Sequence, residues 1–119
     1  WNTHTKGVLQ ISREVSDLAK LARDRKLQME DMTGGTQTLS NLGMFGIKEF
    51  NAIINPPETT ILAAGKMEDR PVVENGTVVP GKVMTLTLTC DHRIVDGAVG
   101  AQYLQDLKKA LEDPLMMLL

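Results

Sequence analysis

The 119-residue sequence has one cysteine, few aromatic residues and no long apolar run. One cysteine cannot form an internal disulfide, so a reducing compartment is expected. No stretch approaches the roughly 20 apolar residues that a membrane-spanning helix needs, and no targeting segment is visible. The 13 basic and 15 acidic residues give a net charge of −2, without the basic surplus typical of nucleic-acid-binding proteins. These absences predict a folded domain that contacts neither membrane nor nucleic acid.

The composition that remains is normal for a globular domain, with 42% hydrophobic and 24% charged residues. Two segments place apolar residues at three- and four-residue steps, which is typical of helices. The first spans residues 8–25, with room for one more short turn in 26–32. The second spans 98–111, with Asp96 as its predicted N-cap and Pro114 after its end.

Several shorter segments are rich in β-branched residues and are predicted to be strands. These are residues 36–40, 59–64 and 83–90, and residues 50–54 are also expected to be extended. Residues 72–79 predict a hairpin, because Asn75-Gly76 between two β-branched runs suits a two-residue turn with positive φ. Two helices and five or six strands predict an α+β fold, with helices packed on a largely antiparallel or mixed β-sheet.

The segment from Cys90 to Gly97 holds the residues most typical of a catalytic site. It places Asp91, His92, Arg93 and Asp96 between the end of a predicted strand and the start of a predicted helix. Histidine takes up and releases protons near neutral pH, and neighbouring carboxylates and a guanidinium can orient it. The same residues also suit structural roles, as a hydrogen-bonded turn histidine, an ion pair and a helix cap. The residues alone leave both interpretations open.

Cys90 lies two positions before His92, so a thiol nucleophile is a second possibility. A buried and unreactive cysteine is the commoner case. No metal site is expected, because His4 and His92 are far apart in sequence and one cysteine adds little to them.

The segment Asp91-His92-Arg93-Ile94-Val95-Asp96-Gly97 resembles the Asp-His-Arg-x-x-Asp-Gly signature of the dihydrolipoamide acyltransferases, the catalytic cores of 2-oxo acid dehydrogenase complexes. Residues 34–43, from Gly34 to Gly43, resemble the family's other catalytic segment. Residues 44–48 and 52–57 are similar to the acetyl-transferring, pyruvate-specific branch. The resemblance covers essentially the whole chain and implies the coenzyme A-dependent acyltransferase fold of chloramphenicol acetyltransferase. Because the family's catalytic domain is longer, residues 1–119 are expected to be its C-terminal half, without a lipoyl or subunit-binding domain.

The resemblance implies transfer of an acetyl group from a dihydrolipoyl group, carried on a separate lipoyl domain, to coenzyme A. It implies that His92 is the general base, that the Ser40 hydroxyl stabilises the oxyanion, and that Asp96 orients the site. Arg93 and Asn41 are expected to support these residues. The family places the site between subunits of a homotrimer that assembles into a large core, with His92 from one subunit and Ser40 from its neighbour.

The expected partners are the lipoyl domain and the decarboxylase and dihydrolipoamide dehydrogenase components of a pyruvate dehydrogenase complex. The expected compartment is the bacterial cytoplasm or the mitochondrial matrix. Two alternatives remain. The first is a protein without catalytic activity, either a structural core or accessory subunit or an inactive fragment. The second is a thiol hydrolase that uses Cys90 and His92. The apolar residues 115–119 are expected either to fold back on the core or to seat in a neighbouring subunit.

Overall fold

The structure is a computed structural model, and it describes residues 2–115. The chain divides into two compact units, one ending at Gly35 and the other beginning at Thr36. Within residues 2–115, no helix is both long enough and apolar enough to cross a membrane. Residues 116–119, which form most of the apolar tail, lie outside the described residues, so the expectation that they contact a neighbouring subunit stays a prediction.

The first unit contains the helix α1 (Val8–Arg23) and the short 3-10 helices η1 (Thr3–Thr5) and η2 (Met29–Met32). The first predicted helix is confirmed by α1, and the extra short turn by η2. No residue of α1 is buried, and Val8 and Val15 of its apolar stripe expose 69% and 59% of their surface. Much of the apolar stripe that the sequence predicts to cover a core is therefore exposed.

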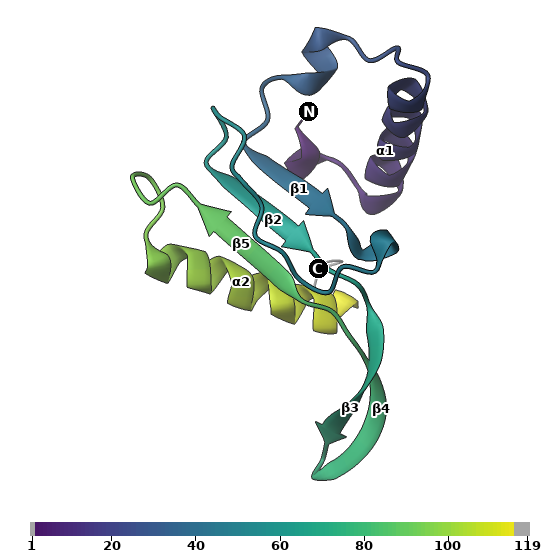
Figure 1. The fold of residues 1–119 in the computed structure, drawn as a ribbon, viewed down its shortest axis with the longest axis vertical. Helices are drawn as coiled ribbons and strands as arrows, with labels where there is room; N and C mark the ends of the chain where they lie inside the picture. Colours follow the sequence, from purple (N-terminus) through teal and green to yellow (C-terminus); the bar gives the residue numbers. More distant parts are fainter. Residues whose placement is uncertain (1, 116–119) are drawn as a thin grey trace. The chain divides into compact units, whose positions relative to one another are not determined.

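The second unit is built on a three-stranded mixed sheet in the order β1-β2-β5 (Figure 1). Strand β1 (Gln37–Asn41) runs parallel to β2 (Thr60–Ala64), and β5 (Leu86–Cys90) runs antiparallel to β2. The buried hydrophobic residues of the described chain are residues 61–64 of β2, which is paired on both sides. A central strand of this kind is expected to be a continuous apolar run. The prediction of an α+β fold with a mixed sheet is confirmed.

Helix α2 (Gly97–Glu112) packs on this sheet through β5. Gly100 is the buried residue of the helix, and a Cβ added there would lie 3.4 Å from Cys90 Sγ. Tyr103 Oη donates a hydrogen bond to Gln37 Oε1 at 3.3 Å, which links α2 to the edge strand β1. The prediction that helices cover the sheet is confirmed for α2, whereas α1 belongs to the first unit.

The predicted hairpin forms from β3 (Glu68–Glu74) and β4 (Thr77–Val83), which make a separate two-stranded sheet. Its turn is Asn75-Gly76, with φ values of 49° and 80°. The prediction of one strand over residues 83–90 is wrong, because β4 ends before the chain enters β5. The two strands belong to different ladders, and the residues between them leave one sheet before joining the other. Residues 50–54, expected to be extended, belong to no strand.

A close backbone crossing follows the end of β2. Gly65 N donates to Thr85 O at 2.9 Å, and Lys66 N donates to Ile47 O at 2.7 Å. A Cβ added to Gly65 would overlap the Lys48 carbonyl oxygen, so this position requires glycine. The crossing therefore joins three segments that are distant in sequence.

Candidate functional site

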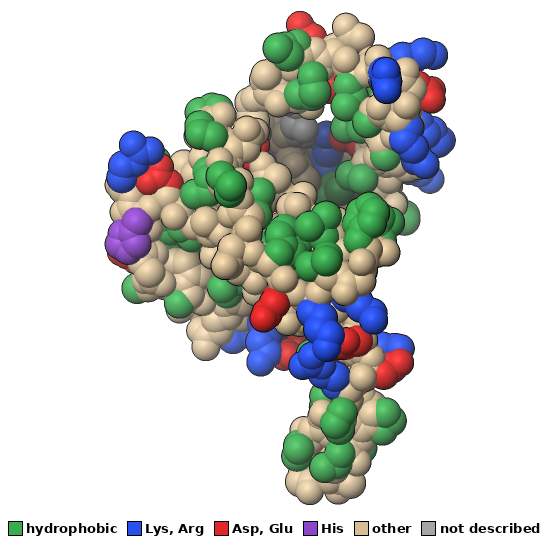
Figure 2. Space-filling view, in the orientation of Figure 1, with side chains coloured by type: hydrophobic (Ala, Val, Ile, Leu, Met, Phe, Trp, Pro, Cys, Tyr) green, Lys and Arg blue, Asp and Glu red, His purple; other side chains and the backbone are tan. Residues whose placement is uncertain are grey.

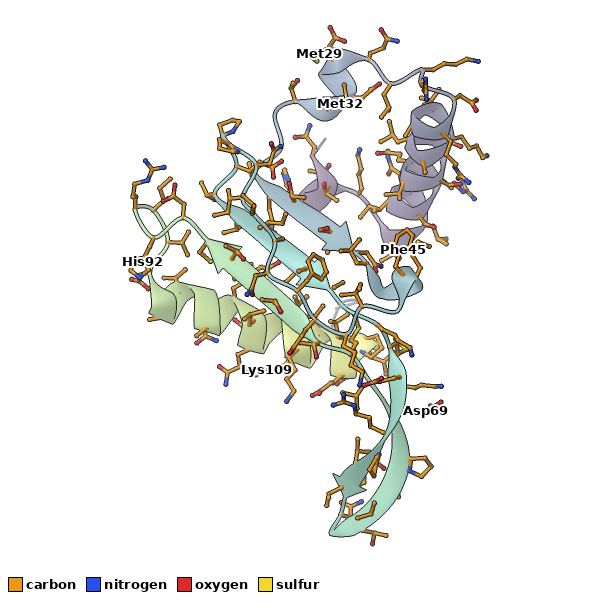
Figure 3. The ribbon with its side chains drawn as sticks, viewed as in Figure 1. Met29, Met32, Phe45, Asp69, His92 and Lys109 are labelled. Carbon is orange, nitrogen blue, oxygen red and sulfur yellow. The ribbon has the colours of Figure 1, made fainter. Side chains whose placement is uncertain are left out.

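The turn between β5 and α2 carries the candidate catalytic histidine, His92. Asp91 N donates to Thr59 O at 2.8 Å, which ties the start of the turn to the residue before β2. Ile94 N and Val95 N donate to Asp91 O at 3.0 and 2.9 Å. These bonds close a tight turn, and His92 is exposed on it, as Figure 3 shows.

An ion pair stiffens this turn. Arg93 Nε and Nη2 donate to the Asp91 carboxylate at 2.9 and 2.6 Å, and Arg93 N donates to Asp91 Oδ1 at 3.0 Å. The guanidinium bonds, followed by the backbone bond, lower the pKa of Asp91 from 3.8 to about 2. The bond to the Asp91 carboxylate raises the pKa of Arg93. The predicted Asp91–Arg93 pair is confirmed, and Asp91 is ionised at neutral pH, where it cannot donate a proton.

Asp96 begins α2. Asp96 Oδ1 accepts a hydrogen bond from Val99 N at 2.8 Å, which confirms the predicted N-cap. The Arg93 side chain is engaged by Asp91, and no bond between Arg93 and Asp96 is found in residues 2–115. In this chain Asp96 therefore fixes the end of the His92 turn through the helix backbone.

A pocket of ≈ 490 Å³ opens beside His92. Its wall comes from the segment before β2, the last residue of β5 and the β5–α2 turn, and it consists of Ile54, Pro56, Pro57, Glu58, Cys90, Asp91, His92, Arg93 and Ile94. The pocket thus places the imidazole among apolar side chains and a few charged groups, a mixture typical of ligand-binding sites.

Glu58 is a pocket residue that no sequence motif indicated. Its carboxylate accepts a hydrogen bond from the Thr38 hydroxyl of β1. The sequence shows only that a charged residue follows Pro56-Pro57, which ends regular structure, and precedes a buried strand. That position gave no indication of the distant partner on β1.

Ser40 lies near the opposite end of the sheet from His92. Ser40 pairs with Ala63, whereas Cys90 pairs with Thr60 on the same central strand. Ser40 and Cys90 are thus three residues apart along the strands and two strands apart across them, or roughly 14 Å between Cα atoms. His92 lies beyond Cys90 at the far end. The structure does not bring Ser40 and His92 together within one chain.

Ser40 has a polar neighbour on its face of β1 and is followed in sequence by a loop with exposed apolar side chains. Ser40 is half-buried and shares its face of β1 with Thr38. Asn41 Oδ1 accepts a hydrogen bond from Gly43 N at 2.9 Å and so turns the chain into the 3-10 helix η3 (Gly43–Phe45). Exposed apolar side chains gather around η3, among them Phe45 (Figures 2 and 3). Asn41 therefore shapes the loop that follows Ser40.

Cys90 and His92 do not form a pair. The Cys90 side chain lies under α2, next to Gly100, and β5 ends at Cys90. His92 therefore does not continue the strand, and no hydrogen bond joins the two side chains in the described part of the chain. Between Asn2 and Leu115, no three His, Cys, Asp or Glu side chains gather where they could hold a metal ion.

Comparison with known proteins places this chain among acyltransferases. The family of 2-oxoacid dehydrogenases acyltransferase (catalytic domain) matches residues 1–119. The dihydrolipoyllysine-residue acetyltransferase component of the pyruvate dehydrogenase complex from Rickettsia felis is 48% identical over 118 residues, or 99% of this chain and 29% of that protein. Its mitochondrial counterpart from Caenorhabditis elegans is 50% identical over 121 residues, or 100% of this chain and 24% of that protein. The chain thus spans less than a third of the length of these relatives.

The solved structure of Azotobacter vinelandii dihydrolipoamide acetyltransferase matches with a TM-score of 0.90 and 37% identity. The match covers 96% of this chain and 47% of that one. In the Azotobacter protein, a serine, a histidine and an asparagine have been investigated for their role in the catalytic mechanism. The predicted acyltransferase fold is confirmed, and with a family match along its whole length the chain belongs to the 2-oxoacid dehydrogenase acyltransferases, as part of their catalytic domain.

Proposed function

We propose that the protein containing this chain transfers an acetyl group from an acetyl-dihydrolipoyl group to coenzyme A, as the dihydrolipoyllysine-residue acetyltransferase of a pyruvate dehydrogenase complex. This proposal rests mainly on the number of positions between Ser40 and His92. The catalytic serine and histidine studied in the Azotobacter protein are 52 positions apart, and so are Ser40 and His92. The asparagine studied there follows the histidine by four positions, where this chain has Asp96.

His92 acts as the general base in the proposed reaction. The neutral imidazole takes the proton of the coenzyme A thiol, and the thiolate attacks the carbonyl carbon of the acetyl-dihydrolipoyl thioester. The tetrahedral intermediate then collapses, and the carbon–sulfur bond to the dihydrolipoyl group breaks. The departing thiolate recovers the proton from the His92 imidazolium. One thioester is exchanged for another, and neither a metal ion nor an oxidant takes part.

Ser40 stabilises the oxyanion of this intermediate by donating its hydroxyl hydrogen bond. The separation of roughly 14 Å between Ser40 and Cys90 along one sheet is too large for direct cooperation with His92 in the same chain. The proposed site therefore combines His92 of one subunit with Ser40 of its neighbour, in a homotrimer that is part of a larger core. Leu39, Met44 and Phe45 are close to Ser40 in sequence, and their exposed apolar side chains support a subunit contact in this part of the chain.

The remaining site residues have positioning roles. Asp96 holds the His92 turn on the N-terminus of α2, and Arg93 holds it through Asp91. Asn41 sets the direction of the chain after Ser40. None of these three roles requires proton transfer.

The proposed enzyme works within a complex. Its substrates are coenzyme A and a lipoyl group carried on a separate lipoyl domain, and its partners are the decarboxylase and dihydrolipoamide dehydrogenase components. The relatives are components of pyruvate dehydrogenase complexes from a bacterium and from mitochondria, which supports both the partners and a location in bacterial cytoplasm or mitochondrial matrix.

Subunit mixing tests the shared site. The full-length parent is prepared as two variants, His92→Ala and Ser40→Ala, which are unfolded together and reassembled in equal amounts. Random assembly joins an intact Ser40 to an intact His92 at about a quarter of the subunit contacts, so about a quarter of wild-type turnover is expected. Each variant reassembled alone is the control. No recovery in the mixture contradicts a shared site, and a wild-type parent that assembles without any acetyl transfer favours a non-catalytic core subunit.

A further inference from the structure

Glu58 is a charged group of the His92 pocket to which the proposed reaction gives no role. It lines the pocket together with His92, and it is half-buried. Its Oε2 accepts the Thr38 hydroxyl hydrogen bond, and Glu58 N donates to Asn55 O at 3.0 Å. Backbone and side chain are therefore both held, and the carboxylate has a fixed place in the wall.

The net charge of the pocket wall depends on three groups besides the imidazole. Asp91 and Arg93 are joined by several hydrogen bonds, so their charges offset each other. Glu58 makes no salt bridge with any residue of the described chain. The wall therefore carries the negative charge of Glu58 next to the apolar surfaces of Ile54, Pro56, Pro57 and Ile94.

The charge of Glu58 affects which thiol-bearing arm the pocket accepts. In the proposed function, on which this inference rests, two thiol-bearing arms meet: a lipoyl arm joined through an uncharged amide, and coenzyme A with its phosphates. A carboxylate accepts hydrogen bonds from amide N–H groups and repels anions. Apolar walls reduce the screening of that repulsion by water.

We propose that Glu58 is a specificity-determining residue, which makes the His92 pocket favour the uncharged lipoyl arm over an arm with an anionic group. The phosphates of coenzyme A stay outside this pocket, and Thr38 is the positioning residue that holds the Glu58 carboxylate in the wall.

The test uses the full-length parent in the reverse direction, with acetyl-coenzyme A as donor. The two acceptors are dihydrolipoamide and dihydrolipoate, which share the dithiol arm and differ in an amide or a carboxylate at its far end. The acetyl group moves to an acceptor thiol, and coenzyme A leaves as a thiol. The wild type is expected to show a higher kcat/KM for the amide than for the acid.

Glu58→Gln keeps the size of the side chain and removes its charge. It is expected to narrow the preference for the amide by roughly three- to tenfold, through KM for the acceptor and without change in KM for acetyl-coenzyme A. Glu58→Asp keeps the charge and is expected to keep the preference. Glu74→Gln removes a charge from the exposed end of β3, which does not line the pocket, and is the matched control.

The other outcomes overturn the proposal. These are a wild-type preference for the acid, an unchanged preference in Glu58→Gln, or a change confined to KM for acetyl-coenzyme A. A fall in kcat alone that Thr38→Val reproduces also overturns it, because Glu58 would then only brace β1. Calorimetry can also measure the binding of the two acceptors directly, without any turnover. An inactive parent would thus contradict the proposed function, while the binding preference would still decide the role of Glu58.

Discussion

The two ends of the β1-β2-β5 sheet hold their candidate catalytic residues in different ways. The His92 turn is closed largely by neighbours in sequence, through the Asp91–Arg93 pair and the Asp96 cap of α2. Within residues 2–115, Ser40 lies on an edge strand that pairs only with β2, and the bonds that hold this strand reach distant segments. One of them joins Thr38 to a residue 20 positions away. The geometry of the histidine is therefore local, whereas that of the serine depends on the whole sheet.

The largest expected effect is that of His92→Ala in the full-length parent. Acetyl transfer should fall by about 10²–10⁴, the usual contribution of a general base, while the particle still assembles. Assembly should survive because the bonds that close the turn are made by Asp91, Arg93 and Asp96. Turnover and sedimentation measure the two effects. Retention of more than about a tenth of wild-type turnover would remove His92 from the mechanism.

Ser40→Ala should have the next largest effect. Loss of an oxyanion donor is expected to lower kcat by about 10²–10³ with little change in either KM, because the donor acts mainly in the transition state. Steady-state kinetics with both substrates varied measures this. Ser40→Thr, which keeps the hydroxyl, is the matched variant. If only KM for coenzyme A changes, Ser40 is a binding residue instead.

Asp96→Ala should produce a smaller loss, this time in stability. Removal of the α2 cap is expected to lower the free energy of unfolding of the parent by about 0.5–2 kcal/mol. Asp96→Asn keeps an oxygen that can accept the Val99 N–H, so it should remain near wild type. Urea unfolding followed by circular dichroism compares them. An equal loss in both variants would mean that the Asp96 charge, not the cap, stabilises the turn.

The smallest expected effect is the acid response of the Asp91–Arg93 pair. The pKa of Asp91 is lower in the folded chain, at about 2, than its ordinary value of 3.8. The stability that follows from this difference is present above the ordinary value and is lost as the pH falls through about 2. The difference in unfolding free energy between wild type and Arg93→Gln should thus be constant above about pH 5 and shrink as the pH falls toward about 2. Unfolding measured across this range decides the point, and a difference that grows toward low pH would contradict it.

Local sequence patterns predicted the features that local bonds create. Asn75-Gly76 forms its hairpin turn, and Asp96 caps α2, because both depend on residues within a few positions. The alternation through residues 83–90 could not reveal the break between β4 and β5, since both strands have the same period. The distance between Ser40 and His92 depends on strand order and register, and the Thr38–Glu58 bond depends on the same long-range pairing. A single sequence does not record these.

The crossing at Gly65 has a consequence for how the second unit opens. The amides of Gly65 and Lys66 bind carbonyl oxygens in two different segments, at Thr85 and Ile47. Neither bond can open by fraying at a chain end, because all four residues lie in connecting segments in the interior of the chain. These two amides should therefore exchange with deuterium more slowly than those at the tip of the β3–β4 hairpin. Their exchange rate would report the cooperative opening of the sheet that separates His92 from Ser40.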